Sequence, residues 1–298
     1  MIYRRFLSKL LLAIAAFITV IFLGTTTVQA QFSAAPFDIS LSPETSVPDR
    51  LEQSRSPSSA SDRGVIGPDN RLRMTRRDYP WSAIGRVDFA TEEGQAHCSG
   101  TLVEADVVLT NAHCVIDPAT HEFHENIQFA PNVIDGQILS QDDVANAESI
   151  FPGTDFRDRP QPPHPDDWAF IKLDRPLGDR YGTVAWQPLP LAALLDGPEQ
   201  YVLVGYSGDF PEENPGMTAG VHDGCSIIGS ADDAFLRHNC DTFSGSSGGP
   251  ILRFFDDQPV IVALNSAALT DRATNAGIVN FAVDLTRMAT RIEQLSSR

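Results

Sequence analysis

Short apolar runs separated by turn residues recur along most of this 298-residue chain. Each run is only three to five residues long, and the clearest ones lie at residues 83–87, 101–103, 107–109, 169–171, 201–204 and 260–264. Runs of this length suit β-strands, and no helical periodicity lies between them. We therefore expect an all-β fold, either a sandwich or a barrel.

One helix is predicted, at the C-terminal end of the chain. Asp284 has a side chain suited to an N-cap, and Leu285, Met288, Ile292 and Leu295 follow it at helical spacing. These four side chains form a single apolar stripe, so the expected role of this helix is packing.

The first thirty residues have the order of a secretory signal. Arg4, Arg5 and Lys9 precede an apolar run over residues 10–23, and the stretch ends in small residues at Ala30, where we expect cleavage. The alternative is an uncleaved membrane anchor, because the apolar run is near the upper length for a signal. We expect ordinary export to the extracellular space or the periplasm, with no stable membrane association after cleavage.

Residues 31–64 differ in composition from the rest of the chain. They are rich in Ser, Pro and acidic residues and contain few aromatic ones. A segment of this kind buries too little apolar surface to order itself, so we expect a propeptide or linker. The apolar runs begin after it, which places one folded domain at residues 65–298.

The net charge excludes two classes of partner. The whole chain carries −17, and removal of residues 1–30 makes this −20, because three basic residues and no acidic one are lost. Nucleic acids and anionic membranes would be repelled by such a surface.

Four cysteines follow the predicted signal: Cys98, Cys114, Cys225 and Cys240. An even number in an exported chain indicates disulfides, and four cysteines allow three pairings. A zinc site is disfavoured because the chain contains no Cys-x-x-Cys pair.

The segment from Cys240 to Pro250 contains a serine suited to nucleophilic catalysis. Ser247 is followed by Gly248 and Gly249 and preceded by Gly245, and glycines permit the tight turn that exposes a hydroxyl and directs backbone N–H groups at a developing oxyanion. The same residues fit the nucleophile elbow of α/β-hydrolases. That fold places its histidine after the serine, and the last histidine here is His238, so this alternative is excluded.

A general base and an orienting acid must then lie upstream of the serine. His113 ends an apolar strand and stands beside a cysteine, and Asp167 precedes the run at 169–171. A lone histidine is more often a core residue, and a lone aspartate is more often a solvated loop charge. Neither residue identifies a site without the other motifs.

Three segments together resemble the catalytic motifs of chymotrypsin-like serine proteases: Thr110–Cys114, Asp167–Phe170 and Gly245–Pro250, in the order His, Asp, Ser. In closer detail, residues 65–71 with 79–86 resemble the mature N-terminus of the bacterial glutamyl-endopeptidase branch. Residues 240–243 resemble the specificity-pocket segment of that branch.

The resemblance implies two antiparallel six-stranded β-barrels with a C-terminal α-helix. It makes Ser247 the nucleophile, His113 the general base and Asp167 the orienting acid, with the N–H groups of Gly245 and Ser247 as the oxyanion hole. Ser266 matches a serine that bonds the triad aspartate and lines the substrate cleft. No cofactor or metal is implied, and a monomer acting on proteins or peptides is expected. The implied disulfides are Cys98–Cys114 and Cys225–Cys240.

Two positions depart from animal trypsins. Position 246 is Ser, where trypsins carry the aspartate that receives a new N-terminal ammonium on activation. Position 243 is Phe, so the disulfide that borders the trypsin pocket is absent. We expect activation by removal of residues 31–64, which exposes Val65 or Gly64, with the new ammonium acting near the specificity pocket.

The substrate-binding residues indicated are Asp241, Thr242, Asn265 and Ser266. Asp241 lies six residues before Ser247, where trypsins place the carboxylate that recognises basic side chains. The same segment occurs in the glutamyl branch, where the Thr242 hydroxyl faces an acidic substrate. The pocket histidine usual in that branch is replaced by Asn265, which donates hydrogen bonds but brings no charge. We expect a preference for Glu at P1, the substrate residue before the scissile bond.

Two alternatives remain open. One is the same protease with a trypsin-like preference for Arg or Lys. The other is a catalytically inactive binding module on the same fold, against which the complete triad argues.

A last cluster combines His121, Glu122, His124 and Glu125. Their spacing could suggest metal ligands, but they lie in a polar loop without a third ligand at metal-binding spacing, so we expect a solvated loop.

Overall fold

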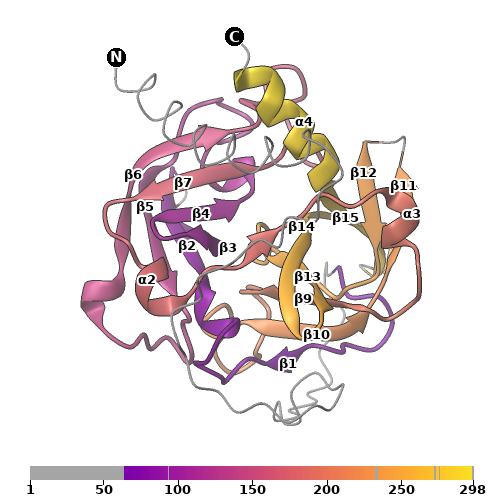
Figure 1. Cartoon of the computed structure of the whole chain (residues 1–298), viewed down its shortest axis with the longest axis horizontal. Coiled ribbons are helices and arrows are strands. Elements are labelled where there is room, and N and C mark those ends of the chain that lie inside the picture. Colours follow the sequence, from indigo (N-terminus) through magenta and orange to yellow (C-terminus); the bar gives the residue numbers. More distant parts are fainter. Residues whose placement is uncertain (1–63, 93, 232–233, 272, 275, 297–298) are drawn as a thin grey trace, which may run out of the picture. The chain divides into compact units, whose positions relative to one another are not determined.

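The computed structural model describes residues 64–296 except 93, 232, 233, 272 and 275 (Figure 1). The predicted signal at residues 1–30 lies outside the described residues, as does the predicted propeptide except for Gly64. The chain divides into two units, of which residues 47–291 contain all the strands of the described part, while residues 1–46 and 292–298 form the other. Among the described residues of that other unit, 292–296 continue the last helix.

Six antiparallel strands close into a barrel in the order β2-β3-β4-β7-β6-β5, drawn from indigo to pink in Figure 1. Their bounds are β2 Ile84–Thr91, β3 Gly94–Glu104, β4 Val107–Thr110, β5 Glu125–Pro131, β6 Ala145–Pro152 and β7 Ala169–Leu173. The short apolar runs of the sequence supply its interior, because Leu102, Leu109, Phe129 and Ile171 are all fully buried.

The second half of the domain is a nine-stranded sheet with the order β1-β10-β9-β13-β14-β15-β12-β11, to which β8 adds beside β14. The bounds are β1 Leu72–Arg73, β8 Ala185–Trp186, β9 Tyr201–Gly205, β10 Gly220–Cys225, β11 Ile227–Ala231, β12 Phe235–His238, β13 Pro250–Phe255, β14 Gln258–Thr270 and β15 Gly277–Asp284. All pairs are antiparallel except β8 with β14. Tyr201, Leu203, Ile251 and Val262 belong to its core.

The predicted all-β fold is confirmed, with one half a closed six-stranded barrel and the other a second sheet that differs from the prediction in its number of strands. That sheet has nine strands where six were expected, and two of them, β1 and β8, are only two residues long. Such short strands carry no readable alternation in the sequence.

The predicted C-terminal helix is also confirmed. Helix α4 spans Leu285–Ser296, and the backbone N–H of Thr286 donates to Asp284 Oδ1 at 2.8 Å, as expected of a capping aspartate. Leu285 and Met288 are fully buried, so the helix packs through its apolar stripe. The remaining helices are short: η1 Trp81–Ala83, η2 Ala112–Cys114, η3 Gln141–Asp143, α2 Gly178–Tyr181 and α3 Leu191–Leu194. Among the described residues, no helix has the length and apolar character needed to span a membrane.

Candidate active site

His113 and Asp167 are brought together by the pairing of β4 with β7. His113 lies in η2, directly after β4, and Asp167 lies two residues before β7; the register sets Thr110 opposite Ala169. The side-chain amide of Asn111 donates to the carbonyl oxygen of Asp167 at 2.6 Å, which fixes the loop before β7. The local fold of the barrel therefore sets the two residues side by side.

The carboxylate of Asp167 binds His113 through both of its oxygens. Oδ2 lies 2.8 Å from His113 Nδ1, and Oδ1 accepts from the backbone N–H of His113 at 3.0 Å. Burial alone would raise the pKa of Asp167, but the charge and hydrogen bonds of His113, with a further bond from Ser266, lower it below its usual value. The carboxylate is thus held ionised beside the imidazole. Its neighbour Asp166 instead faces Arg287, with 3.4 Å between Oδ1 and Nε.

The loop that carries Ser247 is hydrogen-bonded to the first barrel. The Ser99 side chain, on β3, donates to the carbonyl oxygen of Gly245 at 2.9 Å, and its backbone N–H donates to that of Ser247 at 2.8 Å. The Ser247 carbonyl oxygen also lies 3.9 Å from the sulfur of Cys114, the residue after His113. The loop that carries Ser247 therefore lies beside β3 and the turn that carries His113.

Ser266 contacts both the acid and the serine. Its hydroxyl donates to Asp167 Oδ2 at 2.7 Å, and its carbonyl oxygen accepts from the Ser247 hydroxyl at 3.3 Å. Acid, base and serine are therefore parts of one contact network.

The backbone N–H groups of Gly245 and Ser247 donate to no other residue that the structure describes. Gly245 has a φ of +97°, and a Cβ there would stand 2.5 Å from His97 Nε2 and from the carbonyl oxygen of Tyr206, so only glycine fits. These two N–H groups are available to stabilise an oxyanion.

His97 is one residue of this region that the sequence reasoning missed. It packs against Gly245, and its Nε2 donates to the carbonyl oxygen of Tyr206 at 2.8 Å. Burial, with the nearby charge of Arg86, lowers the pKa of His97, so its ring is neutral at neutral pH. No local pattern marks this histidine, because its partners come from distant segments.

The disulfides join Cys98 to Cys114 and Cys225 to Cys240. This is the pairing implied by the family resemblance. The first ties β3 to the turn that carries His113. The second ties the end of β10 to the segment that begins at Asp241.

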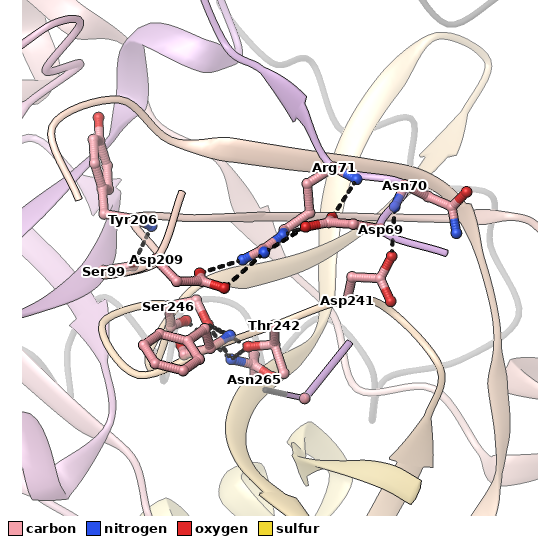
Figure 2. A network of polar contacts seen from close by, with 12 residues as sticks. Asp69, Asn70, Arg71, Ser99, Tyr206, Asp209, Asp241, Thr242, Ser246 and Asn265 are labelled. Atoms are coloured by element: carbon pink, nitrogen blue, oxygen red, sulfur yellow. Dashed lines mark hydrogen bonds and ion pairs between the residues drawn. The ribbon is translucent and has the colours of Figure 1, made fainter. Parts of the chain in front are cut away.

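Asp241 is buried and faces the segment that follows Gly64 (Figure 2). Its Oδ1 accepts from the backbone N–H of Ile66 at 3.0 Å, and its Oδ2 accepts from that of Asn70 at 2.8 Å. Its own backbone N–H donates to His222 Nδ1 at 2.7 Å. The carboxylate is therefore occupied by the fold itself.

Arg71 anchors the same N-terminal segment, and Figure 2 shows it between two acidic side chains. Its guanidinium bonds Asp69 and Asp209, each at 2.7 Å, and is nearly inaccessible to solvent. Burial disfavours the charge, but the two carboxylates outweigh it and raise the pKa of Arg71. Loss of one partner from such a buried network costs about 3–5 kcal/mol.

Thr242, Ser246 and Asn265 form one hydrogen-bonded group beside Asp241 (Figure 2). Asn265 Nδ2 lies 3.0 Å from Thr242 Oγ1 and from the carbonyl oxygen of Ser246, and 3.2 Å from Ser246 Oγ. The hydroxyls of Thr242 and Ser246 also bond each other, and Ser246 donates to the carbonyl oxygen of Phe243 at 2.6 Å. The amide hydrogens of Asn265 are thus used inside the group, where the sequence suggested that they could bind substrate.

The two histidines considered as metal ligands bind different partners. His121 Nδ1 bonds the carbonyl oxygen of Asp155 at 3.1 Å, whereas His124 Nε2 bonds that of His113 at 3.2 Å and its ring stacks on Phe89. Among the described residues, Cys98, His113 and Cys114 have possible ligand atoms within 4.8 Å of one another. Both sulfurs of this group are in the disulfide.

The sequence matches a family model described as the trypsin-like peptidase domain over residues 98–263, more than half of the chain. None of the curated proteins matches it.

Three solved structures are similar to the fold. A Glu endopeptidase in complex with MPD has 22% identity and a TM-score of 0.62, covering 78% of this chain and 100% of that one. A thermostable serine protease, AL20, from an extremophilic microorganism has 23% identity and a TM-score of 0.56, covering 73% and 98%. The protease Anisep from Arthrobacter nicotinovorans has 19% identity and a TM-score of 0.57, also covering 73% and 98%. At these identities the likeness is one of fold.

Proposed function

Since this chain belongs to the family of trypsin-like peptidases and is a serine endopeptidase, we propose that Ser247, His113 and Asp167 carry its catalysis. The observation that supports this most directly is the continuous set of contacts from His113 to Asp167, from Asp167 to Ser266 and from Ser266 to Ser247.

The geometry gives each group a separate task. Asp167 holds the Nδ1–H of His113, which leaves Nε2 as the basic nitrogen that takes the proton of the Ser247 hydroxyl. The Ser247 oxygen then bonds to the scissile carbonyl carbon, and the N–H groups of Gly245 and Ser247 stabilise the resulting oxyanion. His113 returns the proton to the leaving amine, and a water molecule hydrolyses the acyl-enzyme by the same steps.

Ser247→Ala should lower kcat by about a million-fold, because the triad acts as a unit. A fluorophosphonate probe should label the wild-type enzyme and not this variant. If the wild-type protein fails to react with the probe, the chain is an inactive binding module. If the variant keeps near-wild-type activity, the assignment of Ser247 is wrong.

We further propose a preference for Glu at P1. Support comes from Asp241, whose carboxylate binds Ile66 and Asn70 and so is not offered to a basic substrate side chain. The similar fold of a Glu endopeptidase agrees with this proposal. A carboxylate entering the pocket needs donors in place of water, since an uncompensated buried charge costs several kcal/mol. Thr242, by turning its hydroxyl hydrogen away from Ser246 Oγ, and a nearby N-terminal ammonium would supply them.

Matched peptides ending in Glu, Gln, Arg or Phe before the scissile bond should be compared by kcat/KM. We expect Glu first. A tenfold preference for Arg, about 1.4 kcal/mol in transition-state binding, would transfer the assignment to the trypsin-like alternative.

Export and processing complete the proposal. The chain is exported through residues 1–30, acts outside the cytoplasm as a monomer, and becomes active when the segment before Gly64 or Val65 is removed. Gly64 supports this order of events, because its carbonyl oxygen accepts from the N–H of Thr242 at 3.2 Å, so that a new N-terminus here would lie beside a residue proposed to bind substrate. A fully active form that still begins near Gln31 would refute it.

A further inference from the structure

Asn280, on β15, is a fully buried amide beside Gly64. Its Nδ2 donates to the carbonyl oxygens of Gly64 and Cys240, both at 2.7 Å. Its Oδ1 has no hydrogen-bond partner among the described residues. A buried acceptor left unpaired lowers the stability of the fold by about 1–3 kcal/mol, so we expect this oxygen to have a donor in the mature protein.

The same oxygen lies against Gly64. A Cβ on Gly64 would stand 2.6 Å from Asn280 Oδ1, 2.6 Å from Thr242 Cγ2 and 2.9 Å from the Ala268 Cβ. No side chain fits in this space, and Gly64 is further held by the bond from the Thr242 N–H to its carbonyl oxygen. A close fit on three sides suits a residue that stays with the mature enzyme better than one that is discarded.

We propose that the mature chain begins at Gly64, and that Asn280 is a positioning residue whose Oδ1 receives the N-terminal ammonium while its Nδ2 holds the Gly64 carbonyl oxygen. This proposal rests on the processing described above and selects Gly64 over Val65. It identifies the missing donor as the ammonium that cleavage creates.

The sequence places a suitable cleavage site at this point, because Arg63 precedes Gly64. A protease that cuts after arginine would hydrolyse this bond with one water molecule. The Arg63 carbonyl carbon gains the hydroxyl, and the Gly64 nitrogen gains the hydrogen and then takes a proton to become the ammonium.

The surrounding ionisable groups are compatible with a cation here. His238 pairs with Asn280 across β12 and β15, and burial lowers its pKa to about 4, so it is uncharged at neutral pH. On the N-terminal side, the Asp241 carboxylate binds Ile66, two residues after Gly64, while His222 Nδ1 accepts from the Asp241 backbone. The charged groups of the segment itself, Asp69 and Arg71, bond each other.

The first test is the N-terminal residue of active enzyme matured from the full chain, determined by sequencing and intact mass. We expect Gly64. A first residue of Val65 or later would overturn the proposal, because the residue held by Asn280 would be gone. This test needs no variant and no substrate.

The second test is the pKa of the N-terminal amine, measured by competitive acetylation of mature enzyme. The chain contains only two lysines, Lys9 and Lys172, so after processing Lys172 is the single internal reference. A free α-amine titrates at about 7.7–8.0; the burial of Gly64 lowers this value, whereas an acceptor for the charged form raises it. We expect a raised value in the wild type, and a value at or below that of a free amine in Asn280→Leu.

Asn214→Leu is the matched control, since the bonds of Asn214 to the described residues Pro211 and Met217 are made by its backbone. The N-terminal amine of this variant should titrate as in the wild type. A purely structural role of Asn280 would lower the thermal stability of Asn280→Leu without any raised value in the wild type. A wild-type amine that titrates like a free one therefore overturns the proposal even if Asn280→Leu does not fold. Since acetylation uses no substrate, a preference for Arg peptides would refute the Glu proposal alone.

Discussion

Replacing Asp241 by Asn separates a structural carboxylate from one that recognises substrate. Each oxygen of Asp241 accepts one backbone N–H, from Ile66 at 3.0 Å and from Asn70 at 2.8 Å. An asparagine has one acceptor oxygen, so one of these N–H groups faces the new NH₂ and loses its partner. Hydrogen bonds to charged groups contribute about 1.5–3 kcal/mol each, and the abandoned N–H adds to the loss. We expect the free energy of unfolding to fall by roughly 2–3 kcal/mol.

The measurement is urea unfolding in the Ser247→Ala background, which prevents self-digestion. For a domain of this size the thermal midpoint should fall by roughly 4–12 °C. Asp257→Asn is the matched control, because Asp257 is an exposed turn residue with a φ of 62°, a conformation that asparagine also adopts. The control should change stability by less than about 0.5 kcal/mol.

The test is completed by measuring the activity of Asp241→Asn in the enzyme that keeps Ser247. If Asp241 is structural, Asp241→Asn should leave the order of P1 preference unchanged. Unchanged stability together with loss of turnover of Arg peptides would refute the reasoning, since it would show a carboxylate that serves the substrate and not the N-terminal segment.

Three further predictions concern the triad, a disulfide and a buried histidine. Asp167→Asn should lower kcat by roughly 10⁴ with the fold intact, whereas Asp166→Asn should have little effect; the reverse order in a steady-state assay would contradict the assignment. Removal of the Cys225–Cys240 disulfide, whose cysteines are 15 residues apart, should cost about 3 kcal/mol in urea unfolding. His238, with its pKa lowered to about 4, binds a proton more readily when the chain is unfolded. Stability should therefore fall as the pH drops from about 6.5 to 4, by about 3 kcal/mol from this group, and His238→Leu should remove that slope.

Much of the candidate site could be predicted because its signals are local. The glycines around Ser247 mark a turn that exposes a hydroxyl, and His113 and Asp167 each stand beside a short apolar strand. Because β4 and β7 pair in the barrel, these local motifs meet in space. The strands themselves were readable as apolar runs, apart from the two-residue strands β1 and β8.

Other parts of the site have no local signal. His97, Ser99 and Asn280 act through backbone groups of segments far away in the chain; the bond from Asn280 to Gly64, for example, spans 216 positions. In the sequence, a single histidine, serine or asparagine within a strand cannot be distinguished from any other polar strand residue. Its role depends on which loop the tertiary structure places against it.

Asp241 shows most clearly which features cannot be predicted from the sequence. The residues alone indicate the class of fold, the three catalytic motifs and the position of an aspartate six residues before Ser247. The same Cys-Asp-Thr segment fits a pocket for basic or for acidic side chains, because a residue's position does not state which way its carboxylate points. The direction of the carboxylate follows from the folded chain, in which the N–H groups of Ile66 and Asn70, 175 and 171 positions away, bind it and direct it toward the N-terminal segment. A buried charge turns toward the donors that replace its water, and those donors are assembled only when the chain folds.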